Sequence, residues 1–497
     1  MSDVYATLLE RIRRIGRLES MNALLEWDQH TYMPAKGVTG RAELCALIAE
    51  LKHQWLTSDE LGALLEKAVD NGDWAQATNI RETKRSFARA SRVPEELVTR
   101  MARTAAIAQN AWIKARADNH FETFAPHLRE IIELKRLEAE AIGYEGEPYD
   151  ALVDEFEPGA TAAMVEKLFG ELRQRLVPIV SAIAQAKQRP DFELLKRYYP
   201  RAGQEQLGRR IAKEMNFDFD AGRMDESVHP FCMSMNPDDV RLTTRYNEHY
   251  MPSAVFGVMH ETGHSLYEQG LLKEHMFTPA GTAVSLGIHE SQSLLWENQV
   301  GRSQAFWRRH FSMAQELFAA ALGGIAQEDF YAAINTVQPS FIRVDADEVT
   351  YGLHIILRFE LERDILNKKL EVDGIPDAWN AKMKDLLGIT PPTNREGCLQ
   401  DIHWSIGAIG YFPTYAMGSL YAAQFMVAAR TAMPDLDERI EQGDLGLLLG
   451  WLRENIHRHG KRYRPGELCE LVTGKPLSVD AFIAYVQRKF KPIYGLD

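Results

Sequence analysis

The sequence predicts a mainly α-helical protein with a small antiparallel β element. Apolar residues recur at helical spacing along most of the 497 residues, whereas strand-like alternation is confined to short stretches in the middle of the chain. Hydrophobic residues make up 45% and charged residues 26% of the chain, so a large buried core can form. No internal repeat, low-complexity tract or Gly/Ser linker marks a boundary. We therefore expect residues 1–497 to form one domain.

Two stretches illustrate the helical periodicity. The apolar side chains within 128–132 lie on one stripe ahead of Gly143, a residue type that often ends helices. Apolar residues also repeat every four positions from Met164 to Leu176, following Thr161, which can cap a helix start. Both stretches predict amphipathic helices.

The strand signals lie mainly in one region. His229-Pro-Phe-Cys-Met-Ser-Met235 and Val240-Arg-Leu-Thr-Thr-Arg-Tyr246 flank the turn-like Asn236-Pro-Asp-Asp239. This pattern predicts an antiparallel hairpin. Phe341-Ile-Arg-Val344 is a second, shorter strand candidate.

The charge balance and the cysteines exclude some classes of protein. The chain carries 57 basic and 70 acidic residues, a formal charge of -13, without a long basic tract, so we do not expect nucleic acid as a partner. The four cysteines are far apart and lack C-x-x-C spacing, which favours reduced thiols in a cytoplasmic protein. The N-terminal residues mix charged and apolar side chains and are not typical of a secretory signal.

One segment is long enough to cross a bilayer. Residues Trp404 to Ala429 contain no charged side chain. Glycines, Pro413 and several hydroxyl and amide side chains interrupt this segment. It therefore predicts a buried loop that leads into a core helix, and we expect no membrane partner.

The stretch Val258-Met-His-Glu-Thr-Gly-His-Ser-Leu-Tyr-Glu-Gln-Gly270 contains an H-E-x-x-H motif. A helix advances about 100° per residue, so His260 and His264 project from one face and can bind one ion at about 2.0–2.1 Å. Glu261 lies beside them and can accept the proton of a water molecule, as in H-E-x-x-H hydrolases. The alternative is an ordinary helix with two surface histidines, although the motif is expected by chance at a frequency on the order of a few hundredths.

A catalytic zinc site needs a third protein ligand and an open position. The extended H-E-x-x-H-x-x-G-x-x-H form would require glycine at Tyr267 and histidine at Gly270, so the third ligand comes from elsewhere. Glu290, in the helical stretch 287–297, is one candidate, and it could instead favour a helix N-terminus through the dipole. The rival ligands are His275, Glu268 and Glu297.

Beyond this motif, the chain resembles the carboxypeptidase Taq family of metallopeptidases. Family-like residues at the N-terminus are Leu25-Glu-Trp-Asp28 and Met33-Pro34. The family's six signatures occur in order, as His229-Pro-Phe231, Asp239-Val-Arg-Leu-Thr243, His260-Glu-Thr-Gly-His264, His289-Glu-Ser-Gln292, Ile342-Arg-Val-Asp-Ala-Asp347 and Gly397-Cys-Leu-Gln-Asp-Ile-His-Trp404.

The resemblance implies His260, His264 and Glu290 as metal ligands and Glu261 as general base. It also implies an almost wholly helical fold of two lobes around a deep groove, similar to angiotensin-converting enzyme and neurolysin. Family members are usually homodimers that use zinc or cobalt. They remove C-terminal residues from peptides with broad specificity and disfavour proline.

Other residues of the signatures are candidates for substrate contacts. A guanidinium is suited to binding the free carboxylate that an exopeptidase recognises, and Arg343 is the leading candidate. Its alternative role is an ion pair with a nearby acid that holds the loop. Those neighbouring acids are Asp345, Asp347 and Glu348.

Hydrolysis of a peptide creates a tetrahedral oxyanion, which a histidine or tyrosine can stabilise. The candidates are His403, Tyr411 and Tyr415, and a buried structural role for His403 is the alternative. His229 and Arg241 could bind substrate or brace the hairpin, with an Arg241–Asp239 pair slightly favoured. An edge strand of the hairpin could also pair with the backbone of an extended substrate.

Taken together, the sequence predicts a zinc or cobalt metallocarboxypeptidase that acts on peptides. One alternative is an endo-oligopeptidase that uses the same ligands. A second alternative is a non-enzymatic helical binding protein with a structural metal, which would close the open position with a fourth protein ligand.

Overall fold

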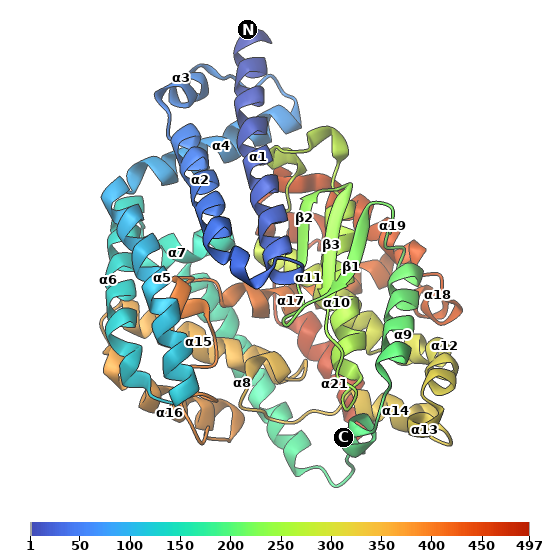
Figure 1. Ribbon diagram of the computed structural model, residues 1–497. Coiled ribbons are helices and arrows are strands. Elements are labelled where there is room, and N and C mark those ends of the chain that lie inside the picture. Colours follow the sequence, from blue (N-terminus) through green and yellow to red (C-terminus); the bar gives the residue numbers. More distant parts are fainter. Residues whose placement is uncertain (1, 497) are drawn as a thin grey trace. The chain divides into compact units, whose positions relative to one another are not determined.

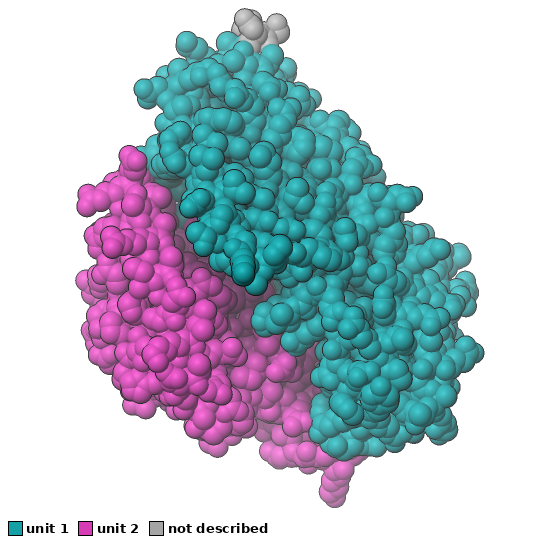
Figure 2. All heavy atoms as spheres, viewed as in Figure 1, with its two compact units in different colours: residues 1–91, 191–334, 422–476 teal, residues 92–190, 335–421, 477–497 magenta. Residues whose placement is uncertain are grey.

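The computed structural model describes residues 2–496, and helices dominate it (Figure 1). The chain divides into two compact units (Figure 2). Unit 1 comprises residues 1–91, 191–334 and 422–476. Unit 2 comprises residues 92–190, 335–421 and 477–497.

Unit 1 contains most of the α-helices and the sheet. Its α-helices are α1 (Ser2–Thr31), α2 (Val38–Leu56), α3 (Asp59–Lys67), α4 (Trp74–Arg92, of which the last residue is assigned to unit 2), α9 (Arg201–Glu214), α10 (Pro252–Gln269), α11 (Leu286–Leu294), α12 (Gln304–Leu317), α13 (Ala319–Leu322), α14 (Gln327–Ile334), α18 (Leu436–Gln442), α19 (Gly446–Asn455) and α20 (Pro465–Thr473).

Unit 2 is built from helices and loops. Its α-helices are α5 (Glu95–Asp118), α6 (Ala125–Ile142), α7 (Pro148–Phe156), α8 (Ala162–Gln185), α15 (Tyr351–Leu366), α16 (Ile375–Leu387) and α21 (Asp480–Tyr494). Helix α17 (Pro413–Ala432) contributes residues to both units.

Short helical turns connect these elements. The turns are η1 (Ala35–Gly37), η2 (Phe121–Thr123), η3 (Phe192–Lys196), η4 (Lys273–His275), η5 (Pro279–Gly281), η7 (Arg343–Asp345), η8 (Val372–Gly374), η9 (His403–Ile406) and η10 (His457–Arg462). The segment η6 (Leu295–Gly301) differs from them because it is a π-helix that continues α11.

The sheet of unit 1 has three strands, β1 (Gly222–Glu226), β2 (Cys232–Asn236) and β3 (Asp239–Thr244), in the order β1-β3-β2. Strands β2 and β3 form the predicted antiparallel hairpin, with an irregularity near Ser234. Strand β1 adds parallel pairing to β3, which the sequence did not predict. Gly222 permits this pairing, since a Cβ there would lie 2.4 Å from the Val240 carbonyl oxygen.

The second strand candidate, 341–344, was wrong. Its last two residues belong to the helical turn η7. In the same turn, the Arg343 amide donates to the Gln400 side chain at 2.8 Å. The backbone hydrogen bonds of this stretch therefore go to a turn and a side chain, and no sheet partner supports an extended run.

Helix α6 ends as the sequence indicates, with Gly143 at its C-terminal cap. Helix α8 begins after Thr161, whose side chain accepts a hydrogen bond from the Met164 amide. The four-residue repeat that the sequence suggested, however, does not match the buried face of α8. A strict four-residue repeat turns about 40° per step, so Met164 is 60% exposed. The buried stripe instead follows mixed three- and four-residue spacing through Val165, Phe169, Leu172 and Leu176.

Helix α10 lies in the core of unit 1. Pro252 occupies its first turn and Gly270 its C-terminal cap. Apolar side chains on several faces are buried because α9, α11, β2 and β3 all pack against this helix. A helix enclosed in this way holds its polar side chains in fixed directions.

The uncharged segment 404–429 behaves as expected. It forms most of η9, a loop and most of α17. Among residues 2–496, no helix is both long and apolar enough to cross a membrane.

Candidate active site

Two helices of unit 1 bring the H-E-x-x-H histidines and Glu290 together. His260 and His264 lie one turn apart on α10, and Glu290 comes from α11. One ligand atom from each residue lies within 4.8 Å of the others. The Glu290 Oε2 atom is 3.8 Å from His260 Nε2 and 3.4 Å from His264 Nε2. The three donors therefore converge on one point.

The close approach of α11 depends on Gly263. A Cβ at this position would lie 2.7 Å from both the Gln292 carbonyl oxygen and the Ser293 Cα. The start of α11 is fixed by Ser285, whose hydroxyl accepts from the Ile288 amide at 3.1 Å. The glycine within the H-E-x-x-H motif thus admits the helix that carries the third donor.

His260 uses both ring nitrogens. Its Nδ1 lies 2.9 Å from Glu297 Oε2, on the other side of the ring from Glu290. Glu297 in turn accepts a hydrogen bond from Arg302 at 3.2 Å. Because the Nδ1 N–H group of His260 donates to Glu297, Nε2 is the ring nitrogen left to bind a cation.

His264 is supported by a different partner. Its Nδ1 lies 2.6 Å from Nδ1 of His289. The other nitrogen of His289, Nε2, lies 2.8 Å from Glu268 Oε1. Glu268 near the end of α10 pairs with His289 on α11, whereas His260, earlier on α10, pairs with Glu297, later on η6. The two helical segments therefore run antiparallel.

Burial and charge shift the pKa values of these groups. Burial disfavours the charged form of His260, but the carboxylates of Glu290 and Glu297 outweigh it and raise the pKa of His260 to about 10. Burial also opposes ionisation of Glu290, whereas the neighbouring His260 and His264 hold the pKa of Glu290 at about 2. Burial lowers the pKa of His264 to about 4. At neutral pH the cluster thus holds an anionic Glu290, a protonated His260 and a neutral His264 in a largely dry environment.

This donor set fits a divalent transition metal. Two imidazole nitrogens and one carboxylate oxygen, with no fourth donor in the cluster formed by residues 2–496, correspond to the three protein ligands of a catalytic zinc site. The remote nitrogens of both histidines are engaged by Glu297 and His289, which is the arrangement that orients histidine ligands.

Glu261 lies beside this cluster on α10 and is 7% exposed. Burial, with a smaller contribution from the Glu290 carboxylate, raises the pKa of Glu261 to about 7. A carboxyl group with a pKa in this range can both accept and return a proton near neutral pH.

The rival ligands lie elsewhere. Glu297 contacts the Nδ1 side of His260, and Glu268 pairs with His289. His275 lies in η4, where its ring packs edge-on against Trp74 with a centroid distance of 4.9 Å. Of the four candidates for a third ligand, only Glu290 contacts the Nε2 atoms of both histidines.

In unit 2, Arg343 belongs to a buried charge cluster. Its Nε and Nη2 atoms donate to Asp401 Oδ1 at 3.0 and 2.9 Å, and its Nη1 donates to the Tyr351 hydroxyl at 3.2 Å. Arg358 donates from Nε to the other oxygen of Asp401 at 2.7 Å. The two arginines hold the pKa of Asp401 well below its usual range, although burial opposes this. Two guanidiniums share one carboxylate, so this group of three carries one excess positive charge.

The acids next to Arg343 in the sequence do not pair with it. Asp347 accepts hydrogen bonds from the amides of Gln338, Val349 and Thr350 near the start of α15. Glu348 pairs with Lys489 and accepts from Tyr485. Asp345 is exposed. The partner of Arg343 is Asp401, from the last of the six signatures.

His403, Tyr411 and Tyr415 form an aromatic group in unit 2. His403 Nε2 lies 3.2 Å from the Tyr415 hydroxyl, and the Tyr411 ring centroid is 5.3 Å from that of His403. Burial lowers the pKa of His403 to about 4, so its ring is neutral at neutral pH. The three predicted side chains are therefore neighbours.

The hairpin arginine has the bracing contacts that the sequence favoured. Arg241 makes a two-point ion pair with Asp239, at 2.7 and 2.8 Å, and lies 4.3 Å over the Trp27 ring. His229 is exposed in the loop before β2, and its carbonyl accepts from Ser227 at 2.6 Å.

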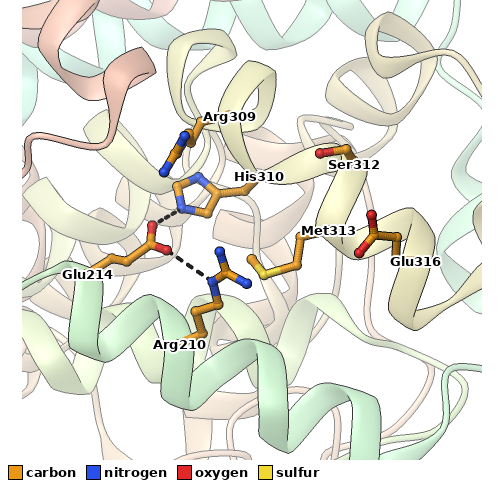
Figure 3. A pocket seen from close by; sticks show the side chains of 7 residues that line it. All are labelled: Arg210, Glu214, Arg309, His310, Ser312, Met313 and Glu316. Carbon is orange, nitrogen blue, oxygen red and sulfur yellow. Dashed lines mark hydrogen bonds and ion pairs between the residues drawn. The ribbon is translucent and has the colours of Figure 1, made fainter.

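Unit 1 also has a polar cavity of about 210 Å³ away from the histidine cluster (Figure 3). Helices α9 and α12 line it, and the Glu214 carboxylate joins them through His310 at 2.6 Å and Arg210 at 3.1 Å. Arg309, Ser312, Met313 and Glu316 complete the lining. Its lining includes none of the residues of the α10 and α11 cluster.

Sequence reasoning missed four residues that shape these groups: His289, Arg358, Asp401, and Glu297 in its supporting position. His289 and Asp401 lie inside quoted signatures, so a signal existed but no role could be assigned. Arg358 lies in the core of α15 without any motif. Only the folded arrangement reveals its ion pair with Asp401.

Comparisons with known proteins identify the family of this chain. The model of the carboxypeptidase Taq (M32) metallopeptidase family matches residues 7–490. Thermostable carboxypeptidase 1 of Thermus thermophilus is 42% identical, over 99% of this chain and 99% of its own. A crystal structure of the M32 carboxypeptidase from Deinococcus radiodurans matches with a TM-score of 0.96 at 39% identity, covering 99% of this chain and 100% of its own. Metallocarboxypeptidase 1 of Trypanosoma cruzi matches with a TM-score of 0.94 at 36% identity, with the same coverage. The chain belongs to the carboxypeptidase Taq (M32) family of metallopeptidases.

Proposed function

We propose that this metallocarboxypeptidase binds its divalent metal through His260, His264 and Glu290 and uses Glu261 as the general base and acid. The convergence of these three donors, with Glu297 and His289 engaging the remote histidine nitrogens, carries the proposal. Zinc suits two imidazoles and a carboxylate best, and cobalt is an alternative. A bound divalent cation supplies Lewis acidity toward the scissile carbonyl and toward water.

The buried Glu261 carboxylate performs the proton transfers. It takes one proton from the attacking water as the carbon–oxygen bond forms at the peptide carbonyl carbon. It then gives that proton to the nitrogen of the leaving amino acid as the carbon–nitrogen bond breaks. The raised pKa of Glu261, about 7, suits both steps.

We further propose His403 with Tyr411 or Tyr415 as the hydrogen-bond donors to the oxyanion. A neutral imidazole and a phenol can donate without adding a charge to the ground state. The lowered pKa of His403 and its contact with the Tyr415 hydroxyl support this assignment.

Arg343 remains our candidate for recognition of the C-terminal carboxylate. The support is electrostatic, because Asp401 compensates only one of the two guanidiniums of Arg343 and Arg358. A substrate carboxylate would neutralise the remaining charge. Substrate contacts from His229 and from an edge strand of the sheet are further proposals, whereas the Asp239 pair and the Trp27 ring favour a bracing role for Arg241.

We also propose that the whole chain works as one catalytic domain, in a cytoplasmic homodimer, on peptides of broad sequence with proline disfavoured at the C-terminus. The family match over residues 7–490 supports the single catalytic domain, and the four free cysteines support the cytoplasmic location. Light scattering of the purified chain tests the dimer. Digests of peptides that differ only in their last residue test the specificity.

The decisive experiment separates metal binding from chemistry. Glu261→Gln should retain about one zinc per chain by elemental analysis and lose hydrolysis by several orders of magnitude. His264→Ala should lose the metal itself. Near-normal turnover by Glu261→Gln would rule out the mechanism. Mass spectra of a digested peptide should show sequential loss of C-terminal residues, whereas internal cuts would favour an endo-oligopeptidase.

A further inference from the structure

His289 lies next to Glu290 in the chain but turns its ring toward α10. Its Nδ1 is 2.6 Å from His264 Nδ1, and its Nε2 is 2.8 Å from Glu268 Oε1. The side chains of His289 and Glu268 are 20% and 17% exposed, so water competes weakly for these bonds. His289 thus bridges the second histidine of the H-E-x-x-H motif to a carboxylate one turn further along the same helix.

The positions of the protons follow from these contacts. For His264 to use its Nε2 lone pair toward a cation, its proton must reside on Nδ1. The facing Nδ1 of His289 must then accept a hydrogen bond from this N–H group, so the proton of His289 lies on Nε2. Glu268 can only accept, and its carboxylate lies at that nitrogen. All three groups are satisfied by one arrangement, and it is the one that leaves His264 Nε2 free.

The two histidines of α10 are therefore supported in different ways. A carboxylate, Glu297, contacts His260 directly. Between His264 and its carboxylate lies the imidazole ring of His289, which also packs against Tyr267 at a centroid distance of 5.2 Å. Rotation of His264 would break its own contact with His289 without any replacement within the cluster.

We propose that His289 and Glu268 are a positioning pair that fixes the tautomer and ring orientation of His264 and thereby strengthens cation binding. This inference rests on the proposed metal site at His260, His264 and Glu290. It assigns a role to the first residue of the His289-Glu-Ser-Gln292 signature, which the catalytic steps leave unused.

The test is a chelator-competition titration with Zn²⁺ on the full-length chain. His289→Phe keeps a planar ring for packing against Tyr267 and removes both hydrogen bonds. It should weaken zinc binding about 10- to 100-fold. Glu268→Gln keeps an acceptor for His289 but removes the charge, so its loss should be smaller. His249→Phe, at an exposed histidine beside Tyr198, is the matched control and should bind zinc as the wild type does.

Thermal melting of the zinc-free variants separates positioning from mere packing. A positioning role predicts melting temperatures near that of the wild type together with the loss of zinc affinity. If His289→Phe and Glu268→Gln both bind zinc within twofold of the wild type, the positioning role is wrong. If the wild type itself binds no zinc, or His264→Ala binds it equally well, the result contradicts the proposed metal site and not the positioning role alone.

Discussion

The Nδ1 atom of His260 lies 2.9 Å from the Glu297 carboxylate, seven residues beyond Glu290 on the same run of helix. One imidazole is therefore held between two carboxylates, with Glu290 facing its Nε2. Arg302 holds Glu297 in turn. The orientation of the ring is fixed from the side remote from the proposed metal.

Removal of this support should weaken metal binding. Glu297→Ala leaves the His260 Nδ1 proton without its acceptor, so we expect zinc affinity to fall about 10- to 100-fold. Chelator competition measures the loss. Glu274→Gln, at an exposed glutamate of η4, is the control and should have no effect. Unchanged affinity in Glu297→Ala would show that the ring needs no support on that side.

Two glycines of α10 provide a second, matched test. At Gly263 a methyl group would meet the backbone of α11 at 2.7 Å, whereas at Gly257 it would meet nothing within 4 Å. Gly263→Ala should lower the free energy of unfolding by about 1–3 kcal/mol. Gly257→Ala should raise it by up to about 1 kcal/mol, since alanine favours helix. Denaturant unfolding of both variants decides, and equal effects would contradict the close approach of the two helices.

The cavity between α9 and α12 predicts a dependence of stability on acid pH. Hydrogen bonding to His310, helped by Arg210 and opposed by burial, lowers the pKa of Glu214 from 4.5 to about 2. A carboxylate with a lowered pKa stabilises the fold fully above about pH 4.5 and loses this contribution as the pH falls toward 2.

Glu214→Gln should therefore be less stable than the wild type by about 1–2 kcal/mol at pH 7, a value reduced for the partial exposure of the pair. The difference should shrink as the pH drops below about 4.5. Urea unfolding at several pH values measures it. Glu316→Gln alters another carboxylate of the same cavity and should show neither effect (Figure 3). A stability difference that grows as the pH falls would contradict a lowered pKa for Glu214.

Asp401 is the only acid that pairs with Arg343 or Arg358 among the described residues. Asp401→Asn leaves two buried guanidiniums without a counter-charge, and we expect a loss of about 3–5 kcal/mol in unfolding free energy. The exposed Asp345, two residues from Arg343, offers the control, and Asp345→Asn should change stability by less than about 0.5 kcal/mol. Comparable stability of the two variants would mean that the cluster is not held by charge.

The sequence predicts the parts of the site that depend on local geometry. His260, Glu261 and His264 lie within two turns of one helix, and helical rise alone places them together. Pro252 in the first turn and Gly270 at the C-terminal cap are residue types typical of the two ends of a helix. Glu290 was one of several candidates by spacing alone, because its position depends on the contact of α11 with Gly263, which is tertiary.

Other features have no local signal. Strand β1 is rich in polar residues and shows no clean alternation, so only its pairing with β3 makes it a strand. The stretch around Arg343 has strand-like residues, yet Gln400 binds its backbone and a turn results. Asp401 and Arg358 are 43 residues apart in sequence, and the burial that pairs them cannot be read from composition.

The π-helical segment η6 lets this helix absorb one extra residue. A π-helix holds about one residue more per turn than an α-helix, so deletion of a single residue within Leu295–Gly301 would let regular α-helix continue. Glu297 and Arg302 are five residues apart, which is one π turn, and a deletion between them would leave them one α-helical turn apart on the same face. We expect chains related to this one to lack one residue of η6 without losing this pair.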